Sequence, residues 1–313
     1  MKLHFLRDRA HMLHQTRSFF TERNVLEVDC PALGLAAPVD LHIEVMKVQL
    51  KEQQIGYLHT SPEYGMKRLL AMGIGDIYQI SHVFRDGEIG PLHNPEFTMA
   101  EWYRLGFSFD QMIEETLAFI RLFLGELPSS RLSYADAFSH YLGIDYTTQT
   151  PQDLLALAQT KGIALSDDAP TWDKDTLLQL LMSIAIEPHL GNDHLLVLLH
   201  FPATQSALAK TMRLPHGEEV ACRFEVYYRG MELANGYHEL TDPIEQRRRF
   251  EQTNRKRLKA GKGPLQIDEK FLNALELGLP DCCGVAVGFD RLMLLRHAQS
   301  SLVNILPFSW QEI

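Results

Sequence analysis

The chain has 313 residues, 45% of them hydrophobic, so it can bury a large core. Its formal net charge of −10 disfavours non-specific binding of nucleic acid, because that binding rests on many Lys and Arg contacts to phosphate. The sequence contains no uncharged stretch of about 18 residues, so we expect no membrane span. The four cysteines have neither a CxxC pair nor zinc-ligand spacing, which favours reduced thiols and a cytoplasmic location.

The N-terminal region predicts a helix followed by short strands. Residues 4–22 carry apolar side chains at helical spacing, and the strand-like VLEV and Pro31 come next. Two further strand-like segments cover residues 41–50 and 55–59. On these residues alone, an ordinary amphipathic helix that packs on its own core is the simpler interpretation.

A second helix is expected from the triplet Ser61-Pro62-Glu63. Ser61 is the expected N-cap, Pro62 the first helical residue, and Gly73 the residue that ends the helix. Glu63 lies in the first turn, where a carboxylate commonly does no more than favour the helix dipole, by about 0.3–1 kcal/mol.

The run IYQISHVFRDGEIGPLHNPEFTMAEWYRL, residues 77–105, predicts two strands joined by a polar loop. Arg85 ends the first strand, and Phe97, Met99, Glu101 and Tyr103 alternate onto one face of the second. A planar cation, an aromatic ring and a carboxylate together suit a ligand with an aromatic base, a phosphate or carboxylate, and an amine.

A purely structural interpretation of this hairpin is open as well. Phe97 and Met99 fit a core, and Glu101 fits an ion pair with Arg104 or Lys67.

The middle of the chain predicts helices without a catalytic constellation. Residues 108–124 form an amphipathic helix with a Ser108 and Gln111 capping box. A helical insertion covers residues 129–190, with helix starts near residues 150 and 173 and a stop at Pro188.

A second hairpin is predicted in RFEVYYRGMELANGYHEL by the turn at Arg229-Gly230. A two-residue turn there pairs Tyr227 with Glu232 and makes Glu225 a diagonal neighbour of Glu232 on the same face. Two carboxylates so placed repel unless a cation lies between them, and Mg²⁺ prefers such oxygen ligands. The alternative is a pair of exposed, solvated glutamates.

The C-terminal third begins with a helix capped by Asp242. Its cations fit either a solvated surface or a docking surface for an acidic partner. They are Arg247, Arg248, Arg249, Arg255, Lys256, Arg257, Lys259 and Lys262. A further helix covers residues 268–277, and GVAVGFDRLMLL, residues 284–295, predicts a strand leading into a helix with Arg291 at its start.

The two arginine-bearing segments resemble motifs 2 and 3 of the class II aminoacyl-tRNA synthetases, and HNPEFTM points to the lysyl branch. Residues 4–31 look like motif 1, which implies a homodimer through the N-terminal helix. The resemblance implies an α+β fold with a mixed, mostly antiparallel sheet flanked by helices. It covers residues 1–313 as one catalytic domain with a helical insertion.

The resemblance also implies ATP and Mg²⁺ as ligands and assigns roles to individual residues. Arg85 and Arg291 are the expected catalytic phosphate ligands. The other expected ATP contacts are Gly87, Glu88, Asn94, Phe97, Glu232, Leu233 and Gly288. The expected substrate contacts are Ser61, Glu63, Tyr103, Asn235, Glu239 and Ala286, and the expected magnesium ligands are Glu225 and Glu232.

Three departures from the lysyl branch affect the expected function. The family usually has Glu two residues after the motif 2 arginine, where this chain has Gly87 followed by Glu88. Motif 1 begins almost at the N-terminus, so we expect no anticodon-binding domain and consider tRNA an improbable partner. Freestanding relatives of this form attach (R)-β-lysine to a lysine of elongation factor P, and Ala286, where Gly is usual, fits that group.

Two alternatives stay open at this point. One is a truncated lysyl-tRNA synthetase acting on α-lysine and another carrier. The other is a non-catalytic regulator, which the presence of Arg85, Glu225, Glu232 and Arg291 disfavours.

Overall fold

The computed structural model describes residues 2–313. Its contacts divide the chain into two compact units, which are described separately. The larger unit is Met1–Gly125 with His238–Ile313, and the smaller unit is Glu126–Tyr237. Our expectation of a single domain over residues 1–313 stays a prediction.

The larger unit contains a mixed sheet in the strand order β1-β5-β6-β13. Its helices are α1 (Leu3–Thr21), α2 (Glu63–Ala71), α3 (Phe109–Leu124), α7 (Pro243–Lys259), α8 (Glu269–Gly278) and α9 (Phe289–Arg296). Its strands are β1 (Leu26–Glu27), β2 (Leu33–Gly34), β3 (Lys47–Gln49), β4 (Ile55–Leu58), β5 (Ile77–Phe84), β6 (Glu96–Leu105) and β13 (Cys282–Gly288). In this sheet β1 pairs parallel with β5, and the other pairs are antiparallel.

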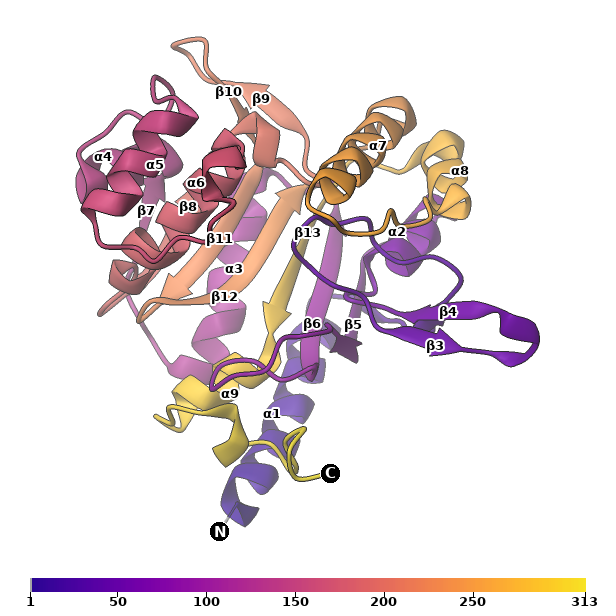
Figure 1. Cartoon of the computed structure of the whole chain (residues 1–313). Helices are drawn as coiled ribbons and strands as arrows, with labels where there is room; N and C mark the ends of the chain where they lie inside the picture. Colours follow the sequence, from indigo (N-terminus) through magenta and orange to yellow (C-terminus); the bar gives the residue numbers. More distant parts are fainter. Residues whose placement is uncertain (1) are drawn as a thin grey trace. The chain divides into compact units, whose positions relative to one another are not determined.

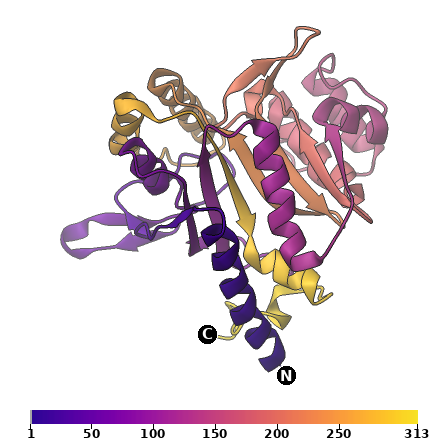
Figure 2. The same ribbon diagram turned by 180° about the vertical axis from the view of Figure 1, so that it is seen from behind.

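Helices α1 and α3 cover one face of these strands (Figure 2). Phe20 of α1 and Phe119 of α3 both contact Trp102 of β6, with ring centroids 5.2 and 5.1 Å away. Trp102, Phe20 and Phe119 have no solvent exposure, so burial of this apolar surface holds the two helices on the sheet. Because side chains alternate along a strand, Glu101 and Tyr103 of β6 lie on the opposite face of the sheet from Trp102.

The predicted hairpin of residues 77–105 is confirmed, and β6 lies between β5 and β13 (Figure 1). Residues of β6 on one face therefore meet residues on one face of β13. Glu101 lies opposite Ala286, and Tyr103 lies opposite Gly284. The register brings motif 2 and motif 3 side by side, although about 180 residues separate them in the sequence.

Two predicted boundaries in the larger unit are wrong. The strand predicted over residues 41–50 is limited to β3, because Asp40 Oδ1 accepts hydrogen bonds from the backbone N–H groups of His42 and Ile43 and holds the chain in a turn. Helix α2 begins at Glu63 with Pro62 as its N-cap residue. Ser61 still bonds the first turn, since its Oγ accepts from the Glu63 N–H at 3.0 Å.

The smaller unit has the strand order β12-β11-β8-β7 and a separate β9-β10 hairpin. Its strands are β7 (Ser129–Ser133), β8 (Leu195–Leu199), β9 (Thr211–Arg213), β10 (Glu219–Ala221), β11 (Arg223–Tyr228) and β12 (Met231–His238), whose last residue belongs to the larger unit. Its helices are α4 (Tyr134–Leu142), α5 (Pro151–Thr160) and α6 (Lys174–Leu181). Here β7 pairs parallel with β8, and β11 pairs antiparallel with both neighbours.

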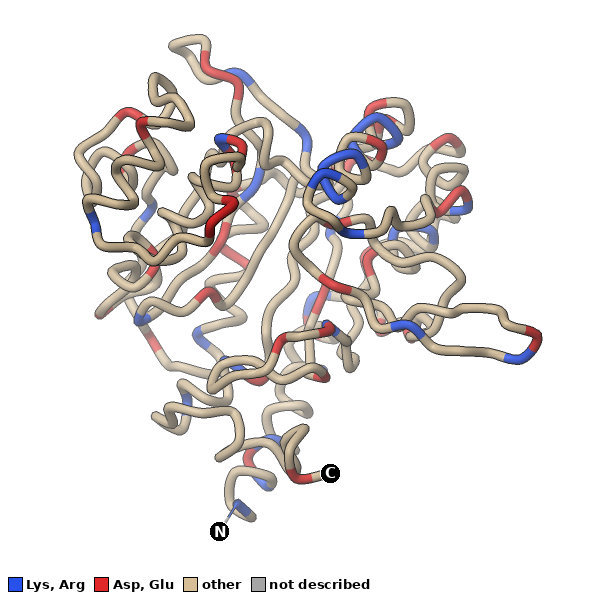
Figure 3. The backbone as a smooth tube through the Cα atoms, in the orientation of Figure 1, with Lys and Arg blue, Asp and Glu red and all other residues tan. Residues whose placement is uncertain are grey.

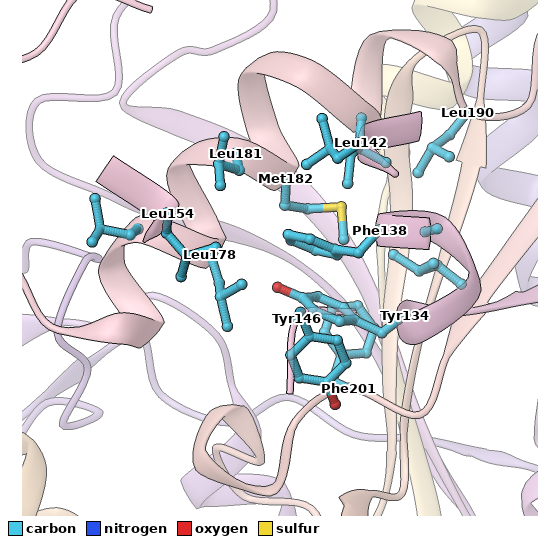
Figure 4. Packing of buried hydrophobic residues seen from close by; sticks show 14 of the residues in the cluster. Tyr134, Phe138, Leu142, Tyr146, Leu154, Leu178, Leu181, Met182, Leu190 and Phe201 are labelled. Atoms are coloured by element: carbon cyan, nitrogen blue, oxygen red, sulfur yellow. The ribbon is translucent and has the colours of Figure 1, made fainter. Parts of the chain in front are cut away.

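The smaller unit has its own apolar core, in which Tyr134, Phe138, Tyr146 and Phe201 pack around one another (Figure 4). The predicted helix starts are confirmed, because Thr150 caps α5 and Asp173 caps α6. After α6, a π-helical segment (Met182–Ile186) and a 3-10 turn (Glu187–His189) carry the helical backbone past Pro188.

The α+β class with a mixed, mostly antiparallel sheet is confirmed. Across residues 2–313, no helix is both long enough and apolar enough to cross a lipid bilayer. Cys30, Cys222, Cys282 and Cys283 are all buried free thiols, as the sequence indicated.

Candidate active site

The larger unit brings three glutamates around one lysine on the polar face of its sheet. We call this group the acidic cluster. Its members are Ser61, Glu63, Lys67, Glu101, Tyr103 and Glu239. They come from the start of α2, from β6 and from the segment after β12, so the tertiary fold alone makes them neighbours.

Lys67 is the cation of the acidic cluster, and its side chain is only 1% exposed. Its Nζ lies 2.6 Å from Glu63 Oε1 and 2.5 Å from Glu239 Oε2. Burial alone would lower the pKa of Lys67, but the charges of Glu239 and Glu63 raise it above its usual value. The lysine is therefore a fixed positive charge.

Within residues 2–313, Glu101 has no ion-pair partner at hydrogen-bonding distance and is bonded by two hydroxyl groups instead. The Ser61 hydroxyl donates to its Oε2 at 2.7 Å, and the Tyr103 hydroxyl donates to its Oε1 at 2.8 Å. Burial and then the charge of Glu63 raise the pKa of Glu101 to about 7. The two ion pairs considered from the sequence do not form, because Lys67 binds the other two glutamates and Arg104 contacts Asp76 and Glu115.

Glu239 is as deeply buried as Lys67. Burial raises its pKa to about 8, even though the nearby Lys67 acts in the opposite direction. Its backbone N–H donates to the Cys282 carbonyl at 3.0 Å, which anchors the residue beside β13. Because this pKa lies above neutral pH, a bound ligand with positive charge would stabilise the ionised form of Glu239.

Strand β13 comes close to this cluster at Gly284. A Cβ atom added to Gly284 would lie 2.4 Å from both Glu239 Oε1 and Tyr103 Cε1. Glycine is therefore required for this close approach. Ala286, opposite Glu101, places a methyl group two residues further along the same face.

His93 contacts one of the two arginines predicted to bind ATP and lies within the electrostatic influence of the other. Arg291 Nη2 lies 2.9 Å from His93 Nε2. Partial burial lowers the pKa of His93, and the charges of Arg291 and, less strongly, Arg85 act in the same direction. The Arg85 guanidinium lies 5.1 Å from the centre of the Phe97 ring, and its buried Nε has no hydrogen-bond partner in residues 2–313. A buried donor without a partner indicates a missing acceptor, such as a phosphate oxygen or carboxylate.

The loop between β5 and β6 carries the remaining predicted ATP contacts. Glu88 Oε1 lies 3.6 Å from Arg85 Nη1. Gly87 has a φ of +76°, and no atom lies within 4 Å of the position that a Cβ atom would take there. Asn94 uses both ends of its amide within the protein, since Nδ2 donates to the Glu96 carbonyl and Oδ1 accepts from the Trp310 N–H. A nucleotide contact by Asn94 stays a prediction. Gly288, at the end of β13, is the N-cap residue of α9.

A second buried network ties α1 to both arginine-bearing segments. Arg9 binds the Asp290 carboxylate with Nη1, and its Nη2 donates to Thr98 Oγ1 at 2.6 Å. The other oxygen of Asp290 accepts from the Thr98 N–H at 2.7 Å. Thr98 follows Phe97 and Asp290 precedes Arg291, so the network fixes the spacing of the expected nucleotide ligands.

In the smaller unit, the predicted pairing of Tyr227 with Glu232 is confirmed. A bulge between Val226 and Tyr227 places Glu225 opposite Asn235, so these four polar side chains share one face of the hairpin. The turn at Arg229-Gly230 forms as predicted, with positive φ at both residues.

Glu225 is buried in this hairpin and is already partly compensated. Arg223 binds its Oε1, and the Tyr227 hydroxyl donates to its Oε2 at 2.5 Å. Asn235 Oδ1 is buried without a partner among the described residues. Both oxygens of Glu225 already have protein partners, and the assignment of Glu225 and Glu232 as magnesium ligands stays a prediction. No cluster of three or more His, Cys, Asp or Glu side chains in residues 2–313 could hold a metal alone.

The basic run on α7 is largely neutralised within the larger unit. Figure 3 shows its blue segments on α7. Arg247 pairs with Glu269, Arg248 and Arg249 pair with Glu245, and Arg257 and Lys262 pair with Glu44. These pairs favour the solvated-surface interpretation over a docking surface for an acidic partner.

Sequence reasoning did not assign a functional role to Lys67, His93 or Arg9, and it predicted Glu101 on the ligand-facing side of the hairpin without identifying Ser61 as its partner. A signal for Lys67 was present, because it follows Glu63 by four residues on one helix and such pairs face each other. Ser61, which bonds Glu101, and the partners of Arg9 are distant from them in the sequence, so no local pattern indicated these contacts.

The family model for class II tRNA synthetases (D, K and N) matches residues 2–312. The chain is 45% identical over 309 residues to the elongation factor P–(R)-beta-lysine ligase of Vibrio cholerae, with 97% of this chain and 94% of that protein covered. It is 43% identical over 306 residues to the ligase of the same name from Haemophilus influenzae (96% and 93% covered), and 45% identical over 307 residues to that of Klebsiella pneumoniae (96% and 93% covered). The chain therefore belongs to the class II tRNA synthetase family that comprises the D, K and N enzymes.

Proposed function

We propose that this chain is an ATP-dependent ligase that activates (R)-β-lysine as an adenylate and transfers it to a lysine side chain of elongation factor P. The observation that carries the proposal is the buried acidic cluster, which has three carboxylates and a single lysine. Relatives that bear this activity in their names match nearly the whole chain at up to 45% identity, which supports the choice of substrate and acceptor.

The acidic cluster suits the amines of the substrate. (R)-β-lysine carries two amino groups, both cationic near neutral pH, and buried carboxylates bind such cations strongly. We assign Glu63 and Glu239 to the ammonium groups, with Ser61 and Tyr103 as further contacts that hold the Glu101 carboxylate beside them. Ala286 is proposed to shape the floor beside the substrate, and the resemblance adds Asn235 as a further substrate contact.

The activation step uses the two arginines. The carboxylate oxygen of β-lysine attacks the α-phosphorus of ATP, the bond to the bridging oxygen breaks, and pyrophosphate leaves. Arg85 is proposed to hold the α-phosphate and the substrate carboxylate, and Arg291 the γ-phosphate, so that the attack is in line. Phe97 is proposed to stack on adenine, with Gly87, Glu88, Asn94, Leu233 and Gly288 as further nucleotide contacts.

Glu225 and Glu232 are proposed to hold magnesium. The hairpin supplies two carboxylates on one face, and Mg²⁺ usually takes one or two carboxylates plus phosphate oxygens. When bound, the ion neutralises phosphate charge. Arg223 and Tyr227 keep the Glu225 carboxylate oriented whether or not the ion is present.

In the transfer step, the amine of the acceptor lysine attacks the acyl carbon of the adenylate. A new amide bond forms, AMP leaves, and the amine gives up a proton. We propose the cytoplasm as the site of action, since translation factors work there. We also propose a homodimer through the N-terminal helix, where Leu3 is exposed; Leu26, which follows the helix, is exposed as well.

The test is a mass measurement on elongation factor P after incubation with this chain, ATP and (R)-β-lysine. We expect a shift equal to one β-lysyl group, and none with Arg291→Ala, which should fold normally. Parallel reactions with α-lysine and with tRNA test the alternatives. Charging of tRNA without modification of the factor would overturn the proposal in favour of a synthetase activity, and no ATP–pyrophosphate exchange with either lysine would favour a non-catalytic regulator.

A further inference from the structure

We propose that Lys67 is a positioning residue that balances one of the three carboxylates of the acidic cluster. The cluster then has a formal charge of two negative units and accepts a ligand carrying two ammonium groups. This inference rests on the proposed function and adds to it the residue that sets the charge of the substrate site.

The first step is the charge count. Glu63, Glu101 and Glu239 are the carboxylates, and Lys67 is the cation that contacts two of them. Three carboxylates and one ammonium leave two formal negative charges when all three glutamates are ionised. Because the pKa values of Glu101 and Glu239 are raised to about 7 and about 8, a cationic ligand completes this ionisation near neutral pH. Buried charges of one sign repel strongly because little water screens them. A ligand with two ammonium groups neutralises the cluster, whereas a ligand with one leaves a charge uncompensated.

The second step is the position of Lys67. It lies in α2, while Glu239 lies in the segment after β12, so its Nζ joins two separate parts of the larger unit at 2.6 and 2.5 Å. Its side chain is 1% exposed. At that burial the ammonium stays with its carboxylates and is not available to solvent. Each carboxylate is thus held in one orientation before a ligand arrives, which reduces the entropy cost of binding.

The third step is the effect on ionisation. The titratable groups that face Lys67 are Glu63 on α2, Glu101 and Tyr103 on β6, Cys282 on β13, and Glu239. Removing the positive charge makes each of the glutamates harder to ionise, so they keep their protons to higher pH. Binding of a dication should then require a more alkaline solution. A lysine that only filled space would not alter this pH dependence.

The test compares Lys67→Met with Arg68→Met, which removes an exposed cation from the next position of α2. Binding of (R)-β-lysine and of pentane-1,5-diamine is measured by calorimetry between pH 6 and 9, without ATP. We expect Lys67→Met to bind both ligands at least about tenfold more weakly at pH 7, with the pH of half-maximal affinity raised by about one unit, which corresponds to about 1.4 kcal/mol. Arg68→Met should match the unaltered chain.

Unchanged affinity and unchanged pH dependence in Lys67→Met would overturn the inference.

If that variant does not fold, as judged by circular dichroism, Lys67→Gln gives the same comparison, because its amide can bond the glutamates without a charge. In Lys67→Ala, added ethylammonium should restore part of the affinity and ethanol should not; equal rescue by both would also overturn the inference. If the unaltered chain binds the diamine but does not modify elongation factor P, the proposed function fails while this inference stands.

Discussion

The acidic cluster of the larger unit and the Glu225–Glu232 hairpin of the smaller unit both gather carboxylates beside one internal cation, yet they are built differently. The hairpin residues come from adjacent strands that a two-residue turn connects. The cluster residues come from α2, β6 and the segment after β12, which are far apart in the sequence. Local strand pairing creates the hairpin site, and packing of distant segments creates the acidic cluster.

The cations of the two sites also differ in their relation to the carboxylates. Arg223 and Glu225 lie two residues apart on one strand and neutralise each other locally. Lys67 instead joins two segments and leaves Glu101 with only hydroxyl partners. The hairpin therefore suits one hard cation with phosphate ligands, while the cluster suits an organic dication. The following substitutions test this difference, beginning with the largest expected effect.

Glu239→Gln should have the largest effect, because it removes a charge from a buried ion pair. Because Glu239 is proposed to bind a substrate ammonium, and loss of one partner of a buried hydrogen-bonded charge pair costs about 2–5 kcal/mol of binding free energy, the KM for β-lysine in ATP–pyrophosphate exchange should rise about a hundredfold while the KM for ATP changes little. Asp281→Asn, which alters an exposed carboxylate beside His238, is the control. A normal KM for β-lysine would show that the cluster does not bind the substrate.

Gly284→Ala should disturb the same cluster by steric means. The new methyl would overlap Glu239 and Tyr103, and overpacking of this kind costs about 1–3 kcal/mol. We expect the KM for β-lysine to rise about tenfold or more, with a lower free energy of unfolding in urea. Gly263→Ala is the matched control, since no atom lies within 4 Å of the added methyl there. Equal behaviour of the two variants would contradict the assigned close approach.

Glu232→Gln should affect only the magnesium requirement of the hairpin. Loss of one carboxylate ligand should raise the Mg²⁺ concentration needed for half-maximal exchange about tenfold, or about 1.4 kcal/mol. The KM for β-lysine at saturating Mg²⁺ should stay near that of the unaltered chain. A shift in that KM without a change in Mg²⁺ requirement would assign Glu232 to the substrate instead.

Thr98→Val should have the smallest effect. It removes the Oγ1 acceptor of Arg9 but keeps the shape of the side chain, so we expect a loss of about 1 kcal/mol in unfolding free energy and a modest rise in the KM for ATP. Thr116→Val, which removes only a hydroxyl bonded to the Met112 carbonyl within α3, serves as the control. If the KM for ATP were equal in both variants, the Arg9 network would be structural only.

Local signals in the sequence predicted most elements of the fold. The Ser108 capping box, the Asp173 and Asp242 caps and the Arg229-Gly230 turn are all present where the pattern indicated. Residues 41–46 failed the strand prediction because Asp40 diverts their backbone into a turn. The basic run on α7 could not be interpreted from the sequence, since the glutamates that neutralise Arg257 and Arg247 lie elsewhere in the chain.

By itself the sequence determined the family, the two arginine-bearing motifs and the pairing of Tyr227 with Glu232, because each depends on residues that are near neighbours along the chain; the bulge that places Glu225 opposite Asn235 was not predicted. Only the tertiary structure decided that Lys67, Glu101 and Glu239 share one buried site and that His93 lies near both arginines. Burial and charge act through distance in space, so their effects appear only once β6, β13 and α2 have packed together.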